Sequence, residues 1–281
     1  MSKHNEKWCL VNTPEQQTTH FEVSSFCIQA PESEPSPIDD FYSYSQDIIK
    51  LGKHDQLTNN PLLGRLLLQA LMSGVELYFR SILSGIIKHC PLARKHAFDL
   101  PISLYAVEYY GLEEIGLGLL EGVSFAESDA IKKQTERLTG IKIKGGTSVA
   151  TTLIDFEKIC QFRHAATHSR GQLSARNLRK LGFSADKTRF ALSVSSDAFQ
   201  NTAQICHNCV QAYNRYLYRE LIQRWLGHSI LTGNWETDGD KFSNLFKLFK
   251  SEIDNVALSS PQEAYQDLKP AILDSLAHKL K

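Results

Sequence analysis

Apolar residues recur at every third or fourth position over long parts of this chain, which is the pattern of amphipathic helices. The clearest stretch starts after Asn60-Pro61. It predicts a helix of about seven turns that ends near Cys90-Pro91, because the residue before a proline disfavours helical backbone. The apolar stripe of this helix comprises Leu63, Leu67, Leu71, Val75, Tyr78, Ile82 and Ile86. We expect this helix to face the core along its whole length.

The same spacing predicts two more long helices. One covers 148–168 and has Arg163 on its apolar stripe, with Gly171 as a C-terminal cap. The other starts at Ser196 or Asp197, either of which can cap a helix, and ends near Leu226. Weaker patterns predict shorter helices over 101–120 with a break at Gly111, over 124–138, over 242–253 and after Pro270, and a short strand over 189–195.

Long helices joined by mostly short links predict an all-α fold, an antiparallel helical bundle. Residues 1–60 are rich in Ser, Thr, Pro and Gln and are interpreted as an irregular, acidic N-terminal extension. The bundle itself is assigned to 61–228, and 229–281 to a short helical C-terminal tail. The sequence has no internal repeat.

Composition excludes several classes of protein. With 281 residues, 42% of them hydrophobic and 22% charged, the chain has enough apolar residues for a sizeable core and is neither disordered nor fibrous. The apolar stretch 62–87 is interrupted by charged residues, and the N-terminal MSKHNEKW is not an export signal. Six cysteines are too few for a disulfide scaffold of this size. We therefore expect a cytoplasmic protein with reduced thiols and no membrane partner.

Charge is balanced overall, since Lys+Arg and Asp+Glu both number 31, but it is uneven along the chain. Residues 1–49 hold eight acids and two lysines. The segment 158–189 has the opposite bias, with one acid, Asp186, and eight basic residues: Lys158, Arg163, Arg170, Arg176, Arg179, Lys180, Lys187 and Arg189. A basic run of this kind either binds phosphates without regard to sequence or is an ordinary solvated connection. One hypothesis is that the acidic segment covers the basic one; the alternative is that it only packs on the bundle.

The most informative local feature is 161–171, which reads QFRHAATHSRG. Arg163 lies on the apolar stripe of its helix, where an unpaired guanidinium is costly, so it needs a partner or an open cleft. Arg163 and His168 are five residues apart, about 140° around an ideal helix. Their side chains therefore meet only if the last turn of the helix unwinds toward Gly171, or if a second subunit supplies one of the two residues.

Arg163, His164 and His168 at the end of a bundle helix resemble the Arg-x4-6-His motif of the HEPN family, in which a polar residue often follows the arginine. The resemblance covers roughly residues 61–226. Glu76, in the first long helix, resembles the acidic residue that many HEPN ribonucleases place near the motif. HEPN toxins partnered with small nucleotidyltransferases usually carry a tyrosine two residues after the motif histidine, whereas this chain has Arg170. We therefore do not expect control by modification of a tyrosine.

The resemblance implies a metal-independent endoribonuclease of the toxin or phage-defence kind, without a cofactor, acting as a homodimer whose two motifs share a cleft. It also implies an antitoxin or defence-system partner. By this match His168 is the acid/base, Arg163 holds the phosphate and His164 orients its neighbours, with Glu76 beside them. Imidazole and guanidinium suit these tasks. Arg170, Arg176, Arg179 and Lys180 are then the expected RNA-binding residues.

Two alternatives remain open. In the first, Arg163 forms a structural pair with Glu76 and His168 merely caps its helix, giving a catalytically inactive HEPN-like protein that binds RNA or regulates a partner protein. The second concerns Cys206-His207-Asn208-Cys209, a C-x-x-C pair. Zinc needs two further ligands, and a redox pair needs its first cysteine at a helix N-terminus, so core cysteines are the favoured interpretation. No metal site is expected.

Overall fold

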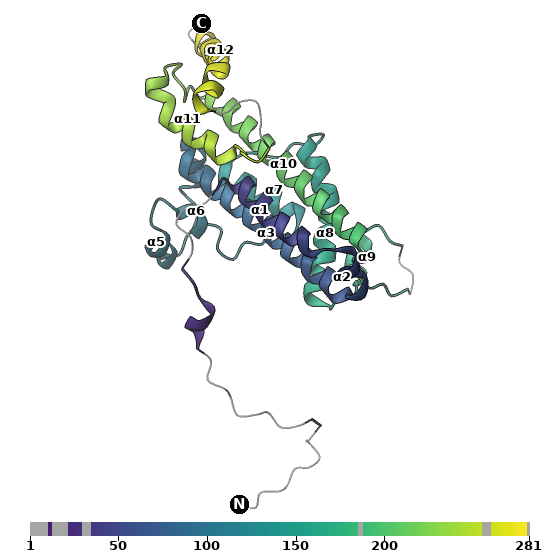
Figure 1. Ribbon diagram of the computed structural model, residues 1–281. Coiled ribbons are helices and arrows are strands. Elements are labelled where there is room, and N and C mark those ends of the chain that lie inside the picture. The colour runs from purple at the N-terminus through teal and green to yellow at the C-terminus, as the bar shows by residue number, and fades with distance from the viewer. Residues whose placement is uncertain (1–10, 13–21, 30–34, 185–187, 255–259, 280–281) are drawn as a thin grey trace, which may run out of the picture. The chain divides into compact units, whose positions relative to one another are not determined.

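The computed structural model describes residues 11–12, 22–29, 35–184, 188–254 and 260–279 (Figure 1). The chain divides into two compact units, Met1–Glu34 and Pro35–Lys281. In the first unit the described part contains a single-turn 3-10 helix, Val23–Phe26. All secondary structure elements of the described residues are helical, which confirms the predicted all-α class.

The second unit contains twelve helices within its described residues. They are α1 (Pro37–Leu51), α2 (His54–Asn59), α3 (Pro61–His89), α4 (Pro91–Ala97), α5 (Leu104–Tyr110), α6 (Ile115–Gly118), α7 (Ser128–Thr139), α8 (Ser148–His168), α9 (Ala175–Lys180), α10 (Ser196–Gly227), α11 (Trp235–Phe249) and α12 (Pro261–Lys279). The three long predicted helices are confirmed as α3, α8 and α10.

Helix α3 is the centre of the second unit. It packs against α1, α2, α4, α6, α7, α8, α10 and α11. Asn60 caps its N-terminus by accepting a hydrogen bond from the Leu63 N–H at 3.2 Å, and Pro61 occupies the first turn. By length and composition α3 could cross a membrane, but 56% of its most apolar window is buried inside the bundle. The apolar stripe of α3 therefore packs in the core of the bundle.

Helices α8 and α10 complete this core. Thr147 caps α8 through the Ala150 N–H, and Ser195, one residue before the predicted position, caps α10 through the Ala198 N–H. Aromatic rings join the three long helices at their centre. The Phe79 ring lies 4.8 Å from that of Tyr213 and 6.3 Å from that of Phe156. This packing fixes the middle of α8 against α3, and the candidate site lies toward the C-terminal end of the same helix.

The prediction of an irregular segment over 1–60 is wrong for residues 37–59, which form α1 and α2. Helix α1 lies along α3 and buries Phe41 completely (Figure 1). The Asp39 carboxylate is also buried and accepts from Ser251 Oγ at 2.5 Å and from the Glu252 N–H at 2.8 Å. Asp39 therefore attaches α1 to the end of α11 and does not cover the basic segment. The rest of the predicted acidic extension lies largely outside the described residues.

Within the predicted helical C-terminal tail, 229–281, the described residues form α11, which packs on α3, and α12, which packs on α10. Helix α12 begins at Pro261 and contains Pro270, where the pattern had suggested a start. The predicted 101–120 helix is two short ones, α5 and α6, separated by Gly111, whose φ of +63° ends α5. The predicted strand over 189–195 is reduced to one isolated bridge, between Gln172 and Ala191.

A buried carboxylate, Asp238, fastens the loop before α11 to α12. It accepts hydrogen bonds from the Thr232 N–H at 2.7 Å and the Tyr265 hydroxyl at 2.6 Å, and lies 3.3 Å from Lys241 Nζ. Burial raises the pKa of the Asp238 carboxyl, but these donors and the Lys241 charge lower it more, so the net shift is downward. The charged form is therefore the one that the fold stabilises.

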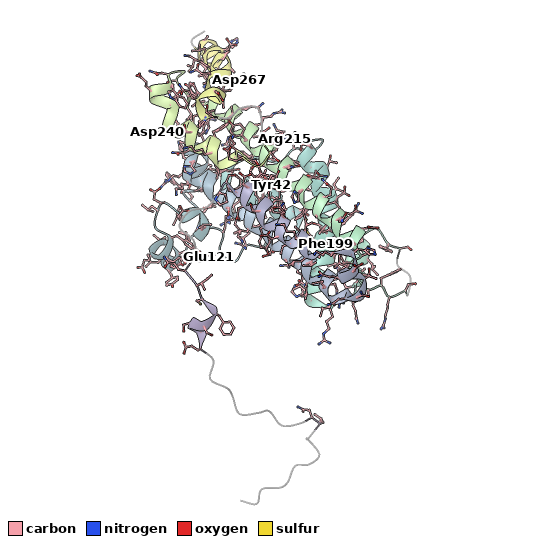
Figure 2. The ribbon with its side chains drawn as sticks, viewed as in Figure 1. Tyr42, Glu121, Phe199, Arg215, Asp240 and Asp267 are labelled. Carbon is pink, nitrogen blue, oxygen red and sulfur yellow. The ribbon has the colours of Figure 1, made fainter. Side chains whose placement is uncertain are left out.

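We expect Asp238→Asn to lower the free energy of unfolding by about 2 kcal/mol at pH 7, because it removes the charge of a buried carboxylate that hydrogen-bond donors and Lys241 stabilise. A depressed folded-state pKa gives stability that is fully present above the unfolded pKa, about 3.9, and is lost as the pH falls through the folded-state value. Thermal unfolding should therefore show a smaller difference in stability between wild type and Asp238→Asn below pH 4 than at pH 7. The control is Asp240→Asn, an exposed position on α11 (Figure 2), and equal losses for both variants would contradict the assignment.

Candidate functional site

Arg163 has the partner that its place on an apolar stripe requires. Its Nη2 lies 3.2 Å from Glu76 Oε1 on α3, with 28% of the arginine side chain and 14% of the glutamate side chain exposed. The second oxygen of Glu76 accepts from the Phe125 N–H at 3.2 Å. The two residues named from the sequence are therefore in contact, and Glu76 also anchors the segment that precedes α7.

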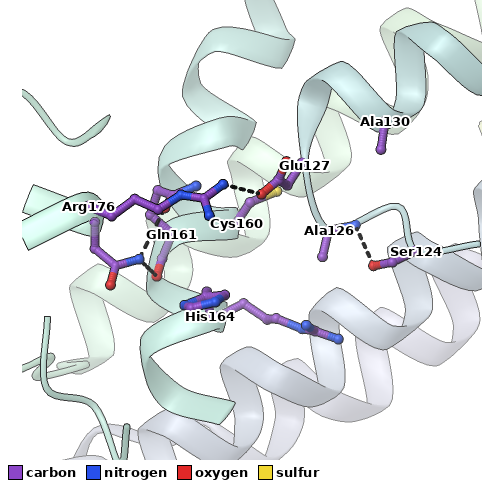
Figure 3. Close-up of a pocket in the computed structure, with 10 residues that line it drawn as sticks. Ser124, Ala126, Glu127, Ala130, Cys160, Gln161, His164 and Arg176 are labelled. Atoms are coloured by element: carbon purple, nitrogen blue, oxygen red, sulfur yellow. Dashed lines mark hydrogen bonds and ion pairs between the residues drawn. The ribbon is translucent and has the colours of Figure 1, made fainter. Parts of the chain in front are cut away.

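Two hollows share Arg163 as a lining residue. The smaller, about 280 Å³, also contains His164 of α8 and Arg176 of α9 (Figure 3). The larger, about 470 Å³, lies between α3 and α8 and also contains Glu76, Arg80 and Thr167. Arg163 is thus accessible from both hollows while its charge is balanced by Glu76.

The two histidines lie one turn apart at the end of α8, and their ring centroids are 4.8 Å apart. Helix α8 continues through His168, so its last turn does not unwind before the histidine. The unwinding that would bring Arg163 and His168 together is therefore absent. Instead, the structure pairs His164 with His168, and His164 lines the smaller hollow beside Arg163. His168 lines neither of the two hollows.

The surroundings of His164 favour its neutral form. Burial lowers the pKa of the His164 imidazole, and the nearby His168, Arg176 and Arg163 lower it further. Glu127, just before α7, opposes these effects without cancelling them. The sequence predicted an orienting role for this residue, and the structure places its ring at the rim of the smaller hollow beside Arg163.

A tight turn follows His168 and ends α8. Arg170 and Gly171 have φ values of +52° and +90°, and the Gly171 N–H donates to the Ala165 carbonyl at 2.9 Å. A Cβ atom at Gly171 would lie 2.8 Å from Arg65 Nη1, and the Arg65 guanidinium donates to the Arg170 carbonyl. The helix cap is at Ser169, two residues before the predicted Gly171, and the glycine allows Arg65 to approach.

Acidic residues outside the basic segment 158–189 pair with much of its positive charge. Arg176 lies 3.5 Å from Glu127, and Lys180 lies 2.9 Å from Glu157. Four of the eight basic residues of 158–189 have such partners: Lys158, Arg163, Arg176 and Lys180. For the expected RNA-binding residues Arg170 and Arg179, both exposed, no ion pair is found within the described chain.

Several residues that shape the site were not identified from the sequence. Asn177 joins Ser174 in a capping box for α9 and donates to Gln161 Oε1 at 3.1 Å, which attaches α9 to α8. Glu127 and Glu157 attach the same short helix through the ion pairs above. The spacing of Ser174 and Asn177 was a local signal for this cap. No local pattern marked the two glutamates.

The C-x-x-C cysteines lie in the core, as expected. Cys206 and Cys209 are fully buried, and Cys160 of α8 is buried among the same helices. Burial raises the pKa of all three thiols, to about 12 for Cys209. Among the described residues no group of three or more His, Cys, Asp or Glu side chains is placed to hold a metal ion. These thiols are therefore packing groups.

Comparisons with protein-family models, with curated proteins and with solved structures find no match for this chain. A guanidinium held by a carboxylate, a second arginine and two adjacent imidazoles form a set that can bind a phosphate and transfer a proton.

The buried thiols give a direct test of the cysteine assignment. Iodoacetamide at pH 7.5 should modify exposed Cys27 in the native protein but not Cys160, Cys206 or Cys209, because buried thiols with raised pKa values supply almost no thiolate. Peptide mass spectrometry of native and guanidinium-unfolded samples checks this, and the unfolded sample serves as the control. Native modification of Cys206 or Cys209 at the rate of Cys27 would contradict core packing.

Proposed function

We propose that this protein is a metal-independent endoribonuclease of the HEPN type, acting as a toxin or phage-defence effector in the cytoplasm. The observation that carries the proposal is the accessible ion pair between Arg163 of α8 and Glu76 of α3. Arg163 directly precedes His164, whose ring lies beside that of His168. An arginine and histidines at the end of a central bundle helix are what the HEPN resemblance requires. The bundle of α3, α8 and α10 is consistent with that fold.

In this proposal Arg163 binds the phosphate of the scissile linkage, and Glu76 holds the guanidinium in place. Arg and carboxylate form a charge-assisted pair with fixed geometry, so the phosphate meets a preorganised donor. His168 transfers a proton during cleavage. The 2′-oxygen of the ribose attacks phosphorus and displaces the 5′-oxygen, which requires a base and an acid but no metal ion.

The proposed active form is a homodimer. Arg163 and His168 point to different sides of α8, and a two-fold axis would bring the His168 of a second copy toward the Arg163 of the first. Toxin or defence roles further imply an antitoxin or defence-system partner that restrains the enzyme. RNA would be bound in addition by Arg170 and Arg179, with Arg176 and Lys180 released from their acidic partners.

One observation favours the alternative function. His168 lines neither hollow, and the Arg163–Glu76 pair also has a structural use because Glu76 holds the Phe125 backbone. A catalytically inactive protein that binds RNA or regulates a partner protein needs only that pair and the exposed arginines. Cleavage assays of site variants separate the two functions.

Arg163→Ala and His168→Ala should each lower the rate of RNA cleavage at least about a hundredfold while leaving the fold intact, because each removes one role in the site. Glu76→Ala should be intermediate. The measurement is cleavage of a labelled RNA by purified protein, with circular dichroism as a check on folding. Matched controls are Arg219→Ala and His278→Ala, which change exposed residues of the same types on α10 and α12. Equal cleavage by wild type and both site variants would exclude the catalytic assignment.

Chelation tests the proposed chemistry independently of the variants. Added EDTA should leave the cleavage rate unchanged, because proton transfer and phosphate binding are assigned entirely to side chains. Loss of cleavage with EDTA, restored by Mg²⁺ or Zn²⁺, would require a different mechanism.

RNA binding can be measured separately in a His168→Ala background. Arg170→Ala and Arg179→Ala should each weaken binding and reduce the slope of log affinity against log salt by about 0.7, the value for one phosphate contact on a single strand. Arg219→Ala is again the control. Unchanged affinity and slope in both variants would exclude these arginines from the RNA surface.

A further inference from the structure

We propose that a hollow lined by α1, α10, α11 and the segment after α11 binds a free α-amino acid with an aromatic side chain. Arg215 binds the carboxylate of this ligand, and Asp254 binds its ammonium group. The hollow has a volume of about 500 Å³, within the range of about 300–1,000 Å³ typical of small-molecule sites. It shares no lining residue with the two hollows around Arg163. Binding there can therefore occur whether or not the protein cleaves RNA.

Two opposite charges line this hollow without neutralising each other. Arg215 of α10 (Figure 2) and Asp254, which follows α11, are both exposed. Neither forms an ion pair within the described part of the chain. Lys250, the third charged residue of the lining, already donates to Glu252 at 2.7 Å. The hollow is thus complementary to a ligand with one negative and one positive group.

Hydrogen bonds hold the Asp254 carboxylate in place. The Gln211 amide donates to the Tyr42 hydroxyl at 2.7 Å, and that hydroxyl donates to Asp254 Oδ2 at 3.0 Å. The Asp254 N–H donates to Ser251 Oγ at 3.0 Å. The carboxylate is therefore fixed relative to α1 and α10 without a ligand, so binding costs little conformational freedom. Its Oδ1 accepts no hydrogen bond from the described residues and is left for an ammonium group.

Aromatic rings form the apolar wall of the hollow. The Tyr218 ring of α10 lies 5.5 Å from that of Phe249 and 6.3 Å from that of Phe246, both on α11. The ring planes are tilted by 49° and 71°, an arrangement that a further ring can join edge to face. An aromatic side chain gains these ring contacts in addition to the burial of apolar surface. An aromatic amino acid therefore matches both the wall and the two charges.

The first test compares four compounds by ligand-detected NMR titration of the full-length protein at pH 7. L-phenylalanine has the ring and both charges. Phenethylamine lacks the carboxylate, 3-phenylpropionate lacks the ammonium group, and L-alanine lacks the ring. Because a hydrogen bond between charged groups changes affinity about tenfold or more, L-phenylalanine should bind at least about tenfold more tightly than each of the other three.

The second test assigns each charge to its residue. Arg215→Gln should remove the preference for L-phenylalanine over phenethylamine and keep the preference over 3-phenylpropionate. Asp254→Asn should do the reverse. Both positions are exposed, so the variants should fold, and circular dichroism checks this. Matched controls are Arg219→Gln on α10 and Asp240→Asn on α11, two exposed residues that do not line the hollow and should leave all four affinities unchanged.

No binding of L-phenylalanine at about 10 mM would overturn the proposal, because affinities weaker than this correspond to almost no specific contact. Binding of phenethylamine, 3-phenylpropionate or L-alanine as tightly as L-phenylalanine would also overturn it, since one charge or the ring would then be unused. The same holds if a site variant weakens all four compounds equally, as damage to the fold does, or if the controls change the preferences.

Discussion

The ion pair between Arg163 and Glu76 is the interaction on which the organisation of the site depends. It joins α8 to α3 at a point where 14% of the Glu76 side chain and 28% of the Arg163 side chain are exposed, so loss of the arginine leaves a poorly solvated carboxylate. Because Glu76 also binds the Phe125 backbone, the same pair positions the segment that forms one wall of the smaller hollow. Access to Arg163 and stability of the bundle are thus coupled.

A second arginine on α3 strengthens this arrangement. Arg80 donates to the Leu120 carbonyl at 2.5 Å and to the Val123 carbonyl, and its guanidinium lies 5.7 Å from the centroid of the Phe125 ring. The segment between α6 and α7 is therefore fixed by side chains of α3 as well as by its own turn hydrogen bonds. A rigid central helix, rather than the loop itself, determines the shape of the site.

Ion pairs also hold helix α9, on the other side of the smaller hollow. Helix α9 is short and basic, and it is held to α7 and α8 by Glu127 and Glu157 through Arg176 and Lys180. Such pairs at partly exposed positions contribute little to stability, about 0–1 kcal/mol each. They can therefore be exchanged for contacts with an anionic ligand at small cost. Four of the eight basic residues of 158–189 are balanced by acids in this way, so the folded surface is less positive there than the count along the segment.

The sequence by itself determined the long helices, because the stripes of α3, α8 and α10 repeat with the helical period over many turns. It also identified Arg163 as a residue in need of a partner, and the structure supplies Glu76. It failed at α1, where a few buried residues such as Phe41 were obscured by Ser- and Pro-rich surroundings. Only the tertiary structure decided that His164 lines the hollow while His168 does not, and that Glu127 and Glu157 neutralise α9. These features depend on side chains from different helices meeting in space, which no local pattern records.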